Sequence, residues 1–227
     1  MTDEEIASSM PTRGRRGRLT RDQVLRAALA LADEGGLEAL TMQAIGRRVG
    51  AEAMSLYRHV RNKDEILEGL VDLVFSEIEL PAGAPDWRTA MRQRAGSARA
   101  VFARHPWAVG LMDAVSRPGP ASLRHHDAVL GVLLGAGFSS VAASHAYSLL
   151  DSYTYGFAIQ ERSLPIADPE TMPDVAAAFL GQLPAAEYPN LAAVAADLVA
   201  VGYDYGAEFE LGLELILDGL ESARNAG

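Results

Sequence analysis

The chain has 227 residues, 49% of them apolar, no cysteine and a net charge of −10. It is long enough to bury one large core or two smaller ones, and without cysteine it has no disulfide, thiolate metal site or cysteine nucleophile. No apolar run approaches the roughly eighteen residues of a membrane span, and no hydrophobic leader follows the charged N-terminus, so we expect a soluble, cytoplasmic protein with no membrane partner.

The charge is unevenly distributed along the chain. Residues 13–63 hold eleven basic and five acidic residues, whereas residues 64–227 hold nine basic and twenty-two acidic ones, so the two parts carry +6 and −13. Every basic residue is an arginine except Lys63. This asymmetry favours a polyanion-binding N-terminal part joined to an acidic body, the alternative being a basic tail with no partner.

The N-terminal segment and the first helix differ sharply in pattern. Residues 1–18 lack hydrophobic periodicity and are rich in Gly, Arg, Ser and Thr, which predicts a disordered basic arm. Thr20 and Gln23 have the spacing of a capping box, so a helix is expected to begin after Thr20. The pair Gly35–Gly36 is expected to end it.

Two short helices are predicted next. The first begins at Thr41, and Gly50 supplies a turn that admits positive φ. The second covers residues 53–60, with Leu56 and Val60 four apart and facing inward. Two short helices joined by a tight glycine turn are typical of a helix-turn-helix motif, although helical bundles also contain such hairpins.

The remaining sequence is predicted to be helical as well. Asn62 and Glu65 mark the start of another helix, and Pro81 and Pro85 mark the junction that follows it. No strand alternation appears in the body, where we expect helices at 87–104, 106–112, 122–135, 139–162 and 203–223. Proline-rich loops are expected at 163–174 and 181–190, flanking a short helix. One side of the last helix carries Phe209, Leu213, Ile216 or Leu217 and Leu220, which suits either a core or a dimer contact.

The second short helix has the side chains of a DNA-binding surface. Tyr57, Ser55 and His59 can donate to phosphate oxygens, and Arg58 can reach a phosphate or a guanine edge. Lys63 is expected in the first turn of the next helix, where its ammonium and the backbone N–H groups can bind one phosphate together. The alternative is a solvated face on a minor helix, but the flanking arginines favour DNA.

These motifs resemble a known family. The stretches "LTRDQVLRAALALADEGGLEALTMQAIGRRVG" and "LYRHVRNKDEIL" are similar to the N-terminal domain of the TetR family of bacterial transcriptional repressors. The turn at 116–118, "GAGFSSVAASHAYSLLDSYTYGF" and "GAEFELGLELILDGLE" resemble the C-terminal domain of the tetracycline repressors. The resemblance implies an all-α homodimeric repressor, with a helix-turn-helix domain at 19–79 and a ligand-binding and dimerisation domain at 86–225. Double-stranded operator DNA with a pseudo-palindromic sequence is the implied partner.

The resemblance also implies which residues face DNA. It places the helix-turn-helix on residues 41–60 and its contacts at Thr41, Gln43, Ala53, Met54, Ser55, Tyr57, Arg58, His59 and Lys63. At Ala53 and Met54 the tetracycline repressors carry glutamine and proline, so their operator sequence is not carried over.

In the body, the resemblance implies a pocket without the metal of the tetracycline repressors. Their magnesium-binding histidine corresponds to Asp113, the supporting glutamate of the partner subunit to Gln160, and two drug-orienting residues to Glu79 and Arg94. We therefore predict no metal site, no cofactor, and a small hydrophobic or amphipathic effector other than tetracycline–magnesium. The predicted lining is Trp107, Met112, Asp113, Arg117, His126, Val129, Tyr147, Asp151 and Tyr155. The last three are four apart on one helical stripe, which fits either a pocket wall or a polar seam between subunits.

Enzyme functions find little support. "GFSSV" lacks the glycine that a nucleophile elbow needs after its serine, and no HExxH is present. His125 and His126 are adjacent, so on a helix they point about 100° apart. We expect these two, His105 and His145 to be capping, surface or pocket residues. The second hypothesis is a helical small-molecule-binding or hydrolytic domain with a non-specific basic arm.

Overall fold

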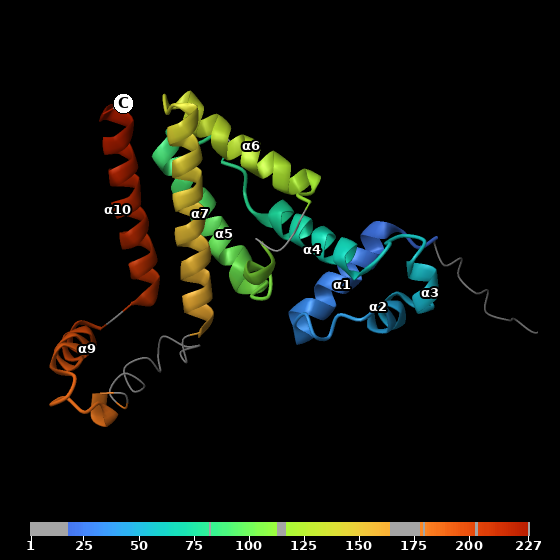
Figure 1. Cartoon of the computed structure of the whole chain (residues 1–227), viewed down its shortest axis with the longest axis horizontal. Coiled ribbons are helices and arrows are strands. Elements are labelled where there is room, and N and C mark those ends of the chain that lie inside the picture. The colour runs from blue at the N-terminus through green and yellow to red at the C-terminus, as the bar shows by residue number, and fades with distance from the viewer. Residues whose placement is uncertain are drawn as a thin grey trace, which may run out of the picture.

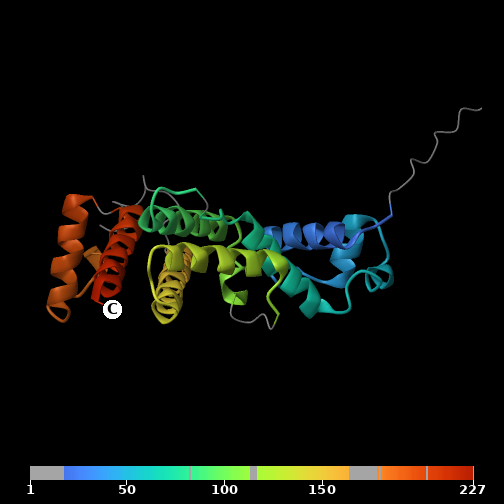
Figure 2. The same cartoon turned by 90° about the horizontal axis from the view of Figure 1, so that it is seen from above.

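The computed structural model describes residues 18–81, 83–112, 117–163, 178, 180–202 and 204–226. All regular elements within these ranges are helices, which confirms the all-α prediction. None of the helices described there combines the length and apolarity of a membrane span. Figure 1 shows a head formed by the first four helices on one side and a larger helical body on the other, and Figure 2 shows the same arrangement from above.

The head consists of α1 (Arg21–Gly35), α2 (Met42–Val49), α3 (Ala53–Leu56) and α4 (Lys63–Glu77). The predicted helix starts are confirmed. Thr20 and Gln23 form both hydrogen bonds of the capping box, and Asn62 Oδ1 accepts from the Glu65 N–H at 2.9 Å. Gly50 ends α2 with φ 68°, a left-handed conformation that glycine adopts without a steric penalty.

The second short helix is shorter than the predicted 53–60. Helical hydrogen bonding ends at Leu56, and the chain continues as a turn. The N–H groups of Arg58 and His59 donate to carbonyls three residues back, at 3.3 and 2.8 Å. This tighter pattern does not extend an α-helix. Leu56 and Val60 are both buried, as their spacing predicts.

The body contains α5 (Trp87–Arg104), the 3₁₀ turn η1 (Val109–Leu111), α6 (Pro120–Gly135), α7 (Ser140–Ser163), α9 (Pro189–Val201) and α10 (Tyr205–Ala226). Helix α9 was not predicted, because its sequence is rich in Ala and Val with few polar residues, so it lacks the regular polar face that marks a surface helix in sequence. No residue of α9 is buried in the single chain. Of the expected loop at 163–174, residues 164–174 lie outside the described residues.

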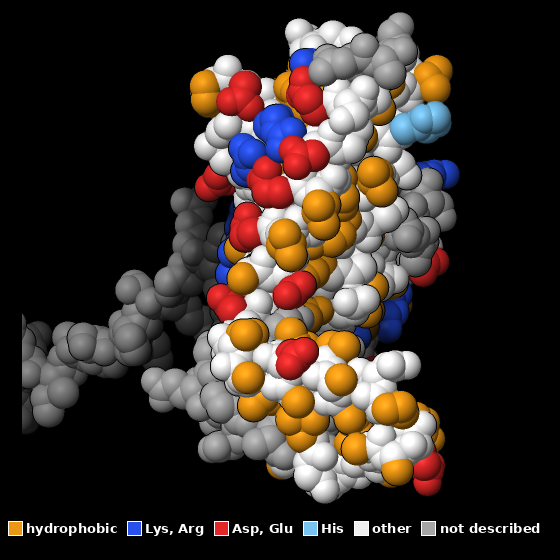
Figure 3. Space-filling model, turned by 90° about the vertical axis from the view of Figure 1, so that its left-hand side faces the viewer, with side chains coloured by type: hydrophobic (Ala, Val, Ile, Leu, Met, Phe, Trp, Pro, Cys, Tyr) orange, Lys and Arg blue, Asp and Glu red, His pale blue; other side chains and the backbone are white. Residues whose placement is uncertain are grey.

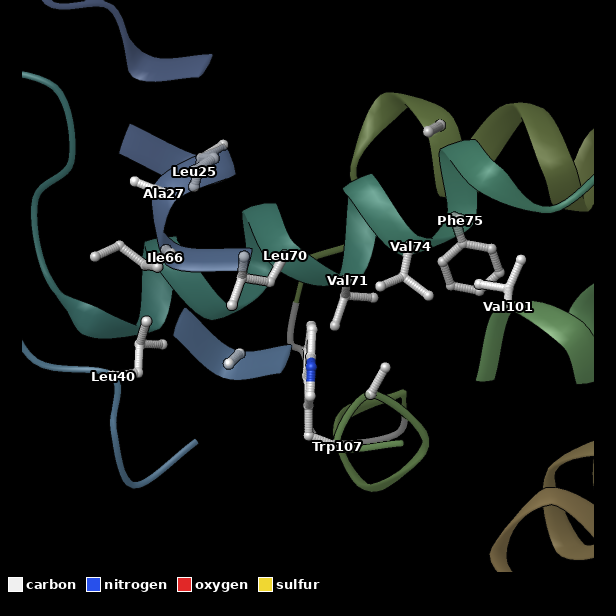
Figure 4. Packing of buried hydrophobic residues seen from close by; sticks show 14 of the residues in the cluster. Leu25, Ala27, Leu40, Ile66, Leu70, Val71, Val74, Phe75, Val101 and Trp107 are labelled. Atoms are coloured by element: carbon white, nitrogen blue, oxygen red, sulfur yellow. The ribbon is translucent and has the colours of Figure 1, made fainter. Parts of the chain in front are cut away.

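Head and body share one hydrophobic core. The core of α1–α4 continues without interruption into Val101 and Phe102 of α5 and into Trp107 and Ala108 beyond it. Figure 4 shows the Trp107 ring directed toward α4, beneath Leu70 and Val71. A second core lies between α5, α6, α7 and α10. The junction after α4 therefore does not separate two independent cores.

A carboxylate of the head also caps a helix of the body. Asp72 Oδ1 accepts from the N–H groups of Ala121 and Ser122 at 2.8 and 2.9 Å. The N-cap of α6 is Gly119, which has no side chain to do this. A Cβ on Gly119 would lie 2.3 Å from Asp72 Cγ, so glycine is what lets α4 approach this helix end. The cap fixes α6 relative to α4.

Candidate functional site

The helix-turn-helix depends on a close approach between α2 and α3. Gly46 accepts a hydrogen bond from the Ala51 N–H at 2.9 Å, and a Cβ added to Gly46 would lie only 2.7 Å from the Ala51 carbonyl oxygen. Ile45 and Leu56 fix the two helices from beneath, because both are fully buried. The four residues of α3 are thereby held at a defined angle to α2.

The predicted DNA-facing residues gather around α3 and the ends of its neighbours. Thr41, Gln43, Met54, Tyr57, Arg58 and Lys63 are exposed, whereas Ala53, Ser55 and His59 are partly exposed. Two of the hydroxyls also stabilise local structure. Thr41 Oγ1 accepts from the Ala44 N–H at 3.1 Å, and the Ser55 hydroxyl donates to the Glu52 carbonyl at 2.6 Å.

The cations of the head fall into two groups. Arg48 forms two hydrogen bonds of 2.6 Å with Glu34, and Arg61 pairs with Glu65 at 3.0 Å. Within the described part of the chain, Arg47, Arg58 and Lys63 have no ion-pair partner, although all three are exposed. Unpaired cations around α3 give the head a local positive charge that a phosphate backbone would neutralise.

The body contains a cavity of about 670 Å³ next to α4. Its wall has an apolar part from the head helix and from the segments flanking α6, and a polar part from α6 and α7. The residues around it are Val71, Phe75, Met112, Pro118, Ser122, His126, Ser144, Tyr147, Ser148, Asp151, Ser152 and Tyr155. This volume is in the usual range for small-molecule sites.

A buried charge pair lies beneath the polar wall. Arg94 of α5 is 1% exposed and forms an ion pair with Asp151 of α7. The Arg94 Nε–H donates to His125 Nε2 at 3.0 Å, and the Tyr155 hydroxyl donates to Asp151 Oδ2 at 3.1 Å. Burial, and after it the nearby Arg94 charge, lowers the pKa of His125 to about 4, so the ring is neutral at neutral pH and can accept this bond.

Several polar atoms of this cluster have no hydrogen-bond partner among the described residues. They are Arg94 Nη1, His125 Nδ1 and the Tyr147 hydroxyl. Arg94 Nη2 and Asp151 Oδ1 contact each other as an ion pair. Burial raises the pKa of Tyr147, which therefore stays a protonated phenol. Unsatisfied buried groups beside a cavity indicate that water or a ligand completes them.

The structure brings five of the nine predicted pocket residues to this cavity: Met112, His126, Tyr147, Asp151 and Tyr155. Three of the others lie elsewhere. Trp107 is in the core shared with the head, Val129 is in the second core, and Arg117 is exposed outside the lining. Asp113 lies outside the described residues.

The serines of this wall were not predicted from the sequence. Ser144, Ser148 and Ser152 follow the same four-residue spacing on α7 as the predicted Tyr147–Tyr155 stripe, displaced by three positions. Helical periodicity alone could have found them. The contributions of Val71 and Phe75 carry no such signal, because nothing in the pattern of α4 distinguishes a cavity wall from a core.

The histidines do not form a metal site in the described part of the chain, where no group of three potential ligands is found. His126 lines the cavity, His125 lies beneath it, and His105 is buried at the head–body junction. His145 is exposed.

Comparison with known proteins shows which family has this arrangement of domains. The family model described as "Tetracyclin repressor-like, C-terminal domain" matches residues 80–224, and the one described as "Bacterial regulatory proteins, tetR family" matches residues 24–70. The chain belongs to the TetR family. A TetR-family protein is a DNA-binding transcriptional regulator rather than an enzyme, which agrees with the prediction from sequence.

Individual TetR-family proteins are similar over most of the chain. The HTH-type transcriptional repressor DrrR1 of Streptomyces coeruleorubidus is 33% identical over 93% of this chain and 80% of the relative. The tetracycline repressor protein class C of Escherichia coli is 30% identical over 91% and 93% of the two chains. ActR from Streptomyces coelicolor, solved in complex with actinorhodin, is 29% identical with a TM-score of 0.76, over 91% of this chain and 97% of that chain.

Proposed function

We propose that this TetR-family regulator binds a pseudo-palindromic operator as a homodimer and is released by a small amphipathic effector other than tetracycline–magnesium. The observation that supports this most directly is the course of α4. This helix begins at Lys63, on the positively charged face, and contributes Val71 and Phe75 to the cavity wall. A single helix thus connects the proposed DNA and effector sites.

The proposed dimer rests on apolar surface that the single chain leaves uncovered. On α10, Phe209, Leu213 and Leu217 are buried, whereas Leu211 and Leu215 are 57% and 65% exposed on another side. Figure 3 shows hydrophobic side chains gathered on this face of the molecule. The exposed apolar residues of α9 include Leu191, Val194 and Val201. An apolar surface of this extent is typical of a protein–protein contact.

Two-fold symmetry sets the form of the operator. A dimer presents two copies of α3, each able to enter a major groove, so the half-sites are expected about one helical turn apart. Arg58 and Met54 are the side chains best placed to sense base edges from their exposure on α3 and the following turn. Tyr57, His59 and Lys63 are assigned to the phosphate backbone.

Substitution of Lys63 tests the DNA-binding assignment. Double-stranded sites selected from random-sequence DNA by the purified protein would be titrated between 50 and 200 mM salt. We expect Lys63→Ala to weaken binding to selected and random DNA alike and to reduce the slope of log K against log salt by about one unit per head, because one phosphate contact is lost.

Arg124→Ala is the matched control, since Arg124 is also exposed and without an ion-pair partner in the described chain, but lies on α6 in the body. Its salt slope should equal that of the wild type. An unchanged slope in Lys63→Ala removes the phosphate role of that residue. Wild-type protein that shows no salt-sensitive DNA binding at all would favour the second hypothesis, a small-molecule-binding helical domain.

The cavity favours an uncharged effector with several hydrogen-bonding groups. Asp151 is already neutralised by Arg94, and six hydroxyl groups line the cavity opposite the apolar side chains of α4. ActR was solved in complex with actinorhodin, which supports a ligand site in this body.

A matched pair of flavanones tests this effector class. Naringenin carries three hydroxyls on the skeleton of flavanone, so calorimetry with the two compounds measures what the polar wall contributes. We expect naringenin to bind about tenfold more tightly or better, since each hydrogen bond contributes about 0.5–1.5 kcal/mol. The difference should shrink in Tyr147→Phe. Equal affinities of the wild-type protein for naringenin and flavanone would contradict a pocket that recognises the hydroxyl groups of its ligand.

A further inference from the structure

His105 joins three elements at the junction between head and body. It follows directly on α5, and its side chain is 7% exposed. One ring nitrogen, Nδ1, lies 2.7 Å from Asp33 Oδ1 of α1, and the other, Nε2, lies 3.1 Å from Glu77 Oε2 of α4. Each ring nitrogen therefore contacts one carboxylate, and a hydrogen bond to an ionised carboxylate is stronger than one between neutral groups.

Two side chains of the body, His105 and Trp107, contact Asp33. The Trp107 Nε1–H donates to the same Oδ1 atom at 2.7 Å. We call His105, Asp33, Glu77 and Trp107 the junction clamp. The last turn of α1 holds no basic residue, so carboxylates there oppose the helix dipole unless other elements supply positive charge or donors. The junction clamp supplies hydrogen-bond donors to Asp33.

The junction clamp is continuous with the cavity wall. From His105 the backbone runs through hydrogen-bonded turns, with the Ala108 N–H donating to His105, Leu111 to Ala108 and Met112 to Val109, at 2.8–3.3 Å. Met112 at the end of this run lines the cavity. A displacement of Met112 by a bound molecule therefore moves a short, internally bonded segment that has His105 at its other end.

On the other side, the junction clamp is one residue from a contact with the helix-turn-helix. Glu34, next to Asp33, binds the Arg48 guanidinium of α2 through two hydrogen bonds of 2.6 Å. The neighbouring Arg47 is one of the unpaired cations of the head. The last turn of α1 thus contacts the body through Asp33 and α2 through Glu34.

We propose that His105 is a positioning residue, which holds α1 and α4 in one orientation relative to the body and through which the cavity acts on α1. This rests on the proposed function for its biological meaning, but the geometry of the junction can be measured without DNA or effector. The connection through α1 is separate from the direct contact of α4 with the cavity.

Double electron–electron resonance on the full-length protein tests the proposal. The chain has no cysteine, so Glu38→Cys in the head and Gln93→Cys on α5 give two unique spin-label sites, both exposed. Dilution with unlabelled protein restricts the signal to distances within one chain. We expect a narrow head–body distance distribution in the wild type and a broad one in His105→Gln, because glutamine cannot bond both carboxylates as the ring does.

Two further variants separate positioning from general destabilisation. Asp33→Asn removes a charge from a partly exposed side chain but keeps an acceptor for the Trp107 N–H. It should broaden the distance distribution as His105→Gln does. The double variant should be no broader than either single variant. Arg104→Gln is the control, because Arg104 pairs with Glu77 at 2.8 Å without reaching Asp33 and is 54% exposed. Its distribution should stay narrow.

The outcomes are distinct. A narrow distance distribution in His105→Gln overturns the proposal. If that variant does not fold, a narrow distribution in Asp33→Asn has the same meaning. Broadening in Arg104→Gln equal to that in His105→Gln also overturns the proposal. If only a tenth of the free heads keep the competent orientation, affinity for selected DNA should fall about tenfold in His105→Gln. Wild-type protein that binds no DNA would refute the proposed function, whereas the distance measurement would still decide the role of His105.

Discussion

Asp151→Ala is expected to lower the free energy of unfolding by about 3–5 kcal/mol, because it leaves the Arg94 guanidinium buried without a counter-charge. Arg94 is 1% exposed and its other polar contact is the neutral ring of His125. The hydrogen bond from the Tyr155 hydroxyl to Asp151 is also lost. Urea unfolding followed by circular dichroism measures the change.

The matched control is Glu161→Ala, which breaks the pair between Arg99 and Glu161 on the same two helices. Both of those side chains reach solvent, so we expect a loss of about 1 kcal/mol or less. Replacing both charges in Arg94→Met/Asp151→Leu should recover most of the stability lost in Asp151→Ala. Equal losses in Asp151→Ala and Glu161→Ala would show that the buried pair is solvated in solution.

Leu56→Ala is expected to cost about 2–5 kcal/mol and to abolish selective DNA binding. Leu56 is fully buried and is the one buried residue of α3, so it alone anchors that helix in the core. Its loss leaves a cavity beneath the residues assigned to base contacts. Thermal unfolding and binding to selected DNA sites measure the two effects.

Met54→Ala on the same four-residue helix provides the comparison. Met54 is 75% exposed, so the stability should change by no more than about 0.5 kcal/mol. Base preference should change in this variant while binding to random DNA remains. If Leu56→Ala leaves the unfolding free energy unaltered, α3 is not anchored through this side chain.

Local signals in the sequence predicted the head well. The capping box at Thr20, the cap at Asn62 and the positive φ at Gly50 all depend on residues within a few positions of one another. Such interactions are formed by the segment itself and survive in any tertiary context. The predicted end of α3 lies four residues beyond its observed end at Leu56, because the choice between helix and turn there depends on packing against α2.

The body was less predictable where distant residues meet. Arg94, His125 and Asp151 come from three helices, and no spacing rule links them. The cap that Asp72 places on α6 spans about fifty residues of sequence and has no local pattern. Helix α9 was not predicted, because its apolar residues face nearly every direction and leave no regular polar face in the sequence.

The shared core has a consequence for protein engineering. Regulators with new specificities are often sought by joining the head of one protein to the body of another, and the proline-flanked junction at residues 81–85 looks like the natural place to cut. A cut there would sever Trp107 and Ala108 from the core they complete with α1–α4. A functional graft of this head should therefore include residues 105–112. Otherwise, the new body needs residues of the same size and shape as Trp107 and Ala108 at the corresponding positions.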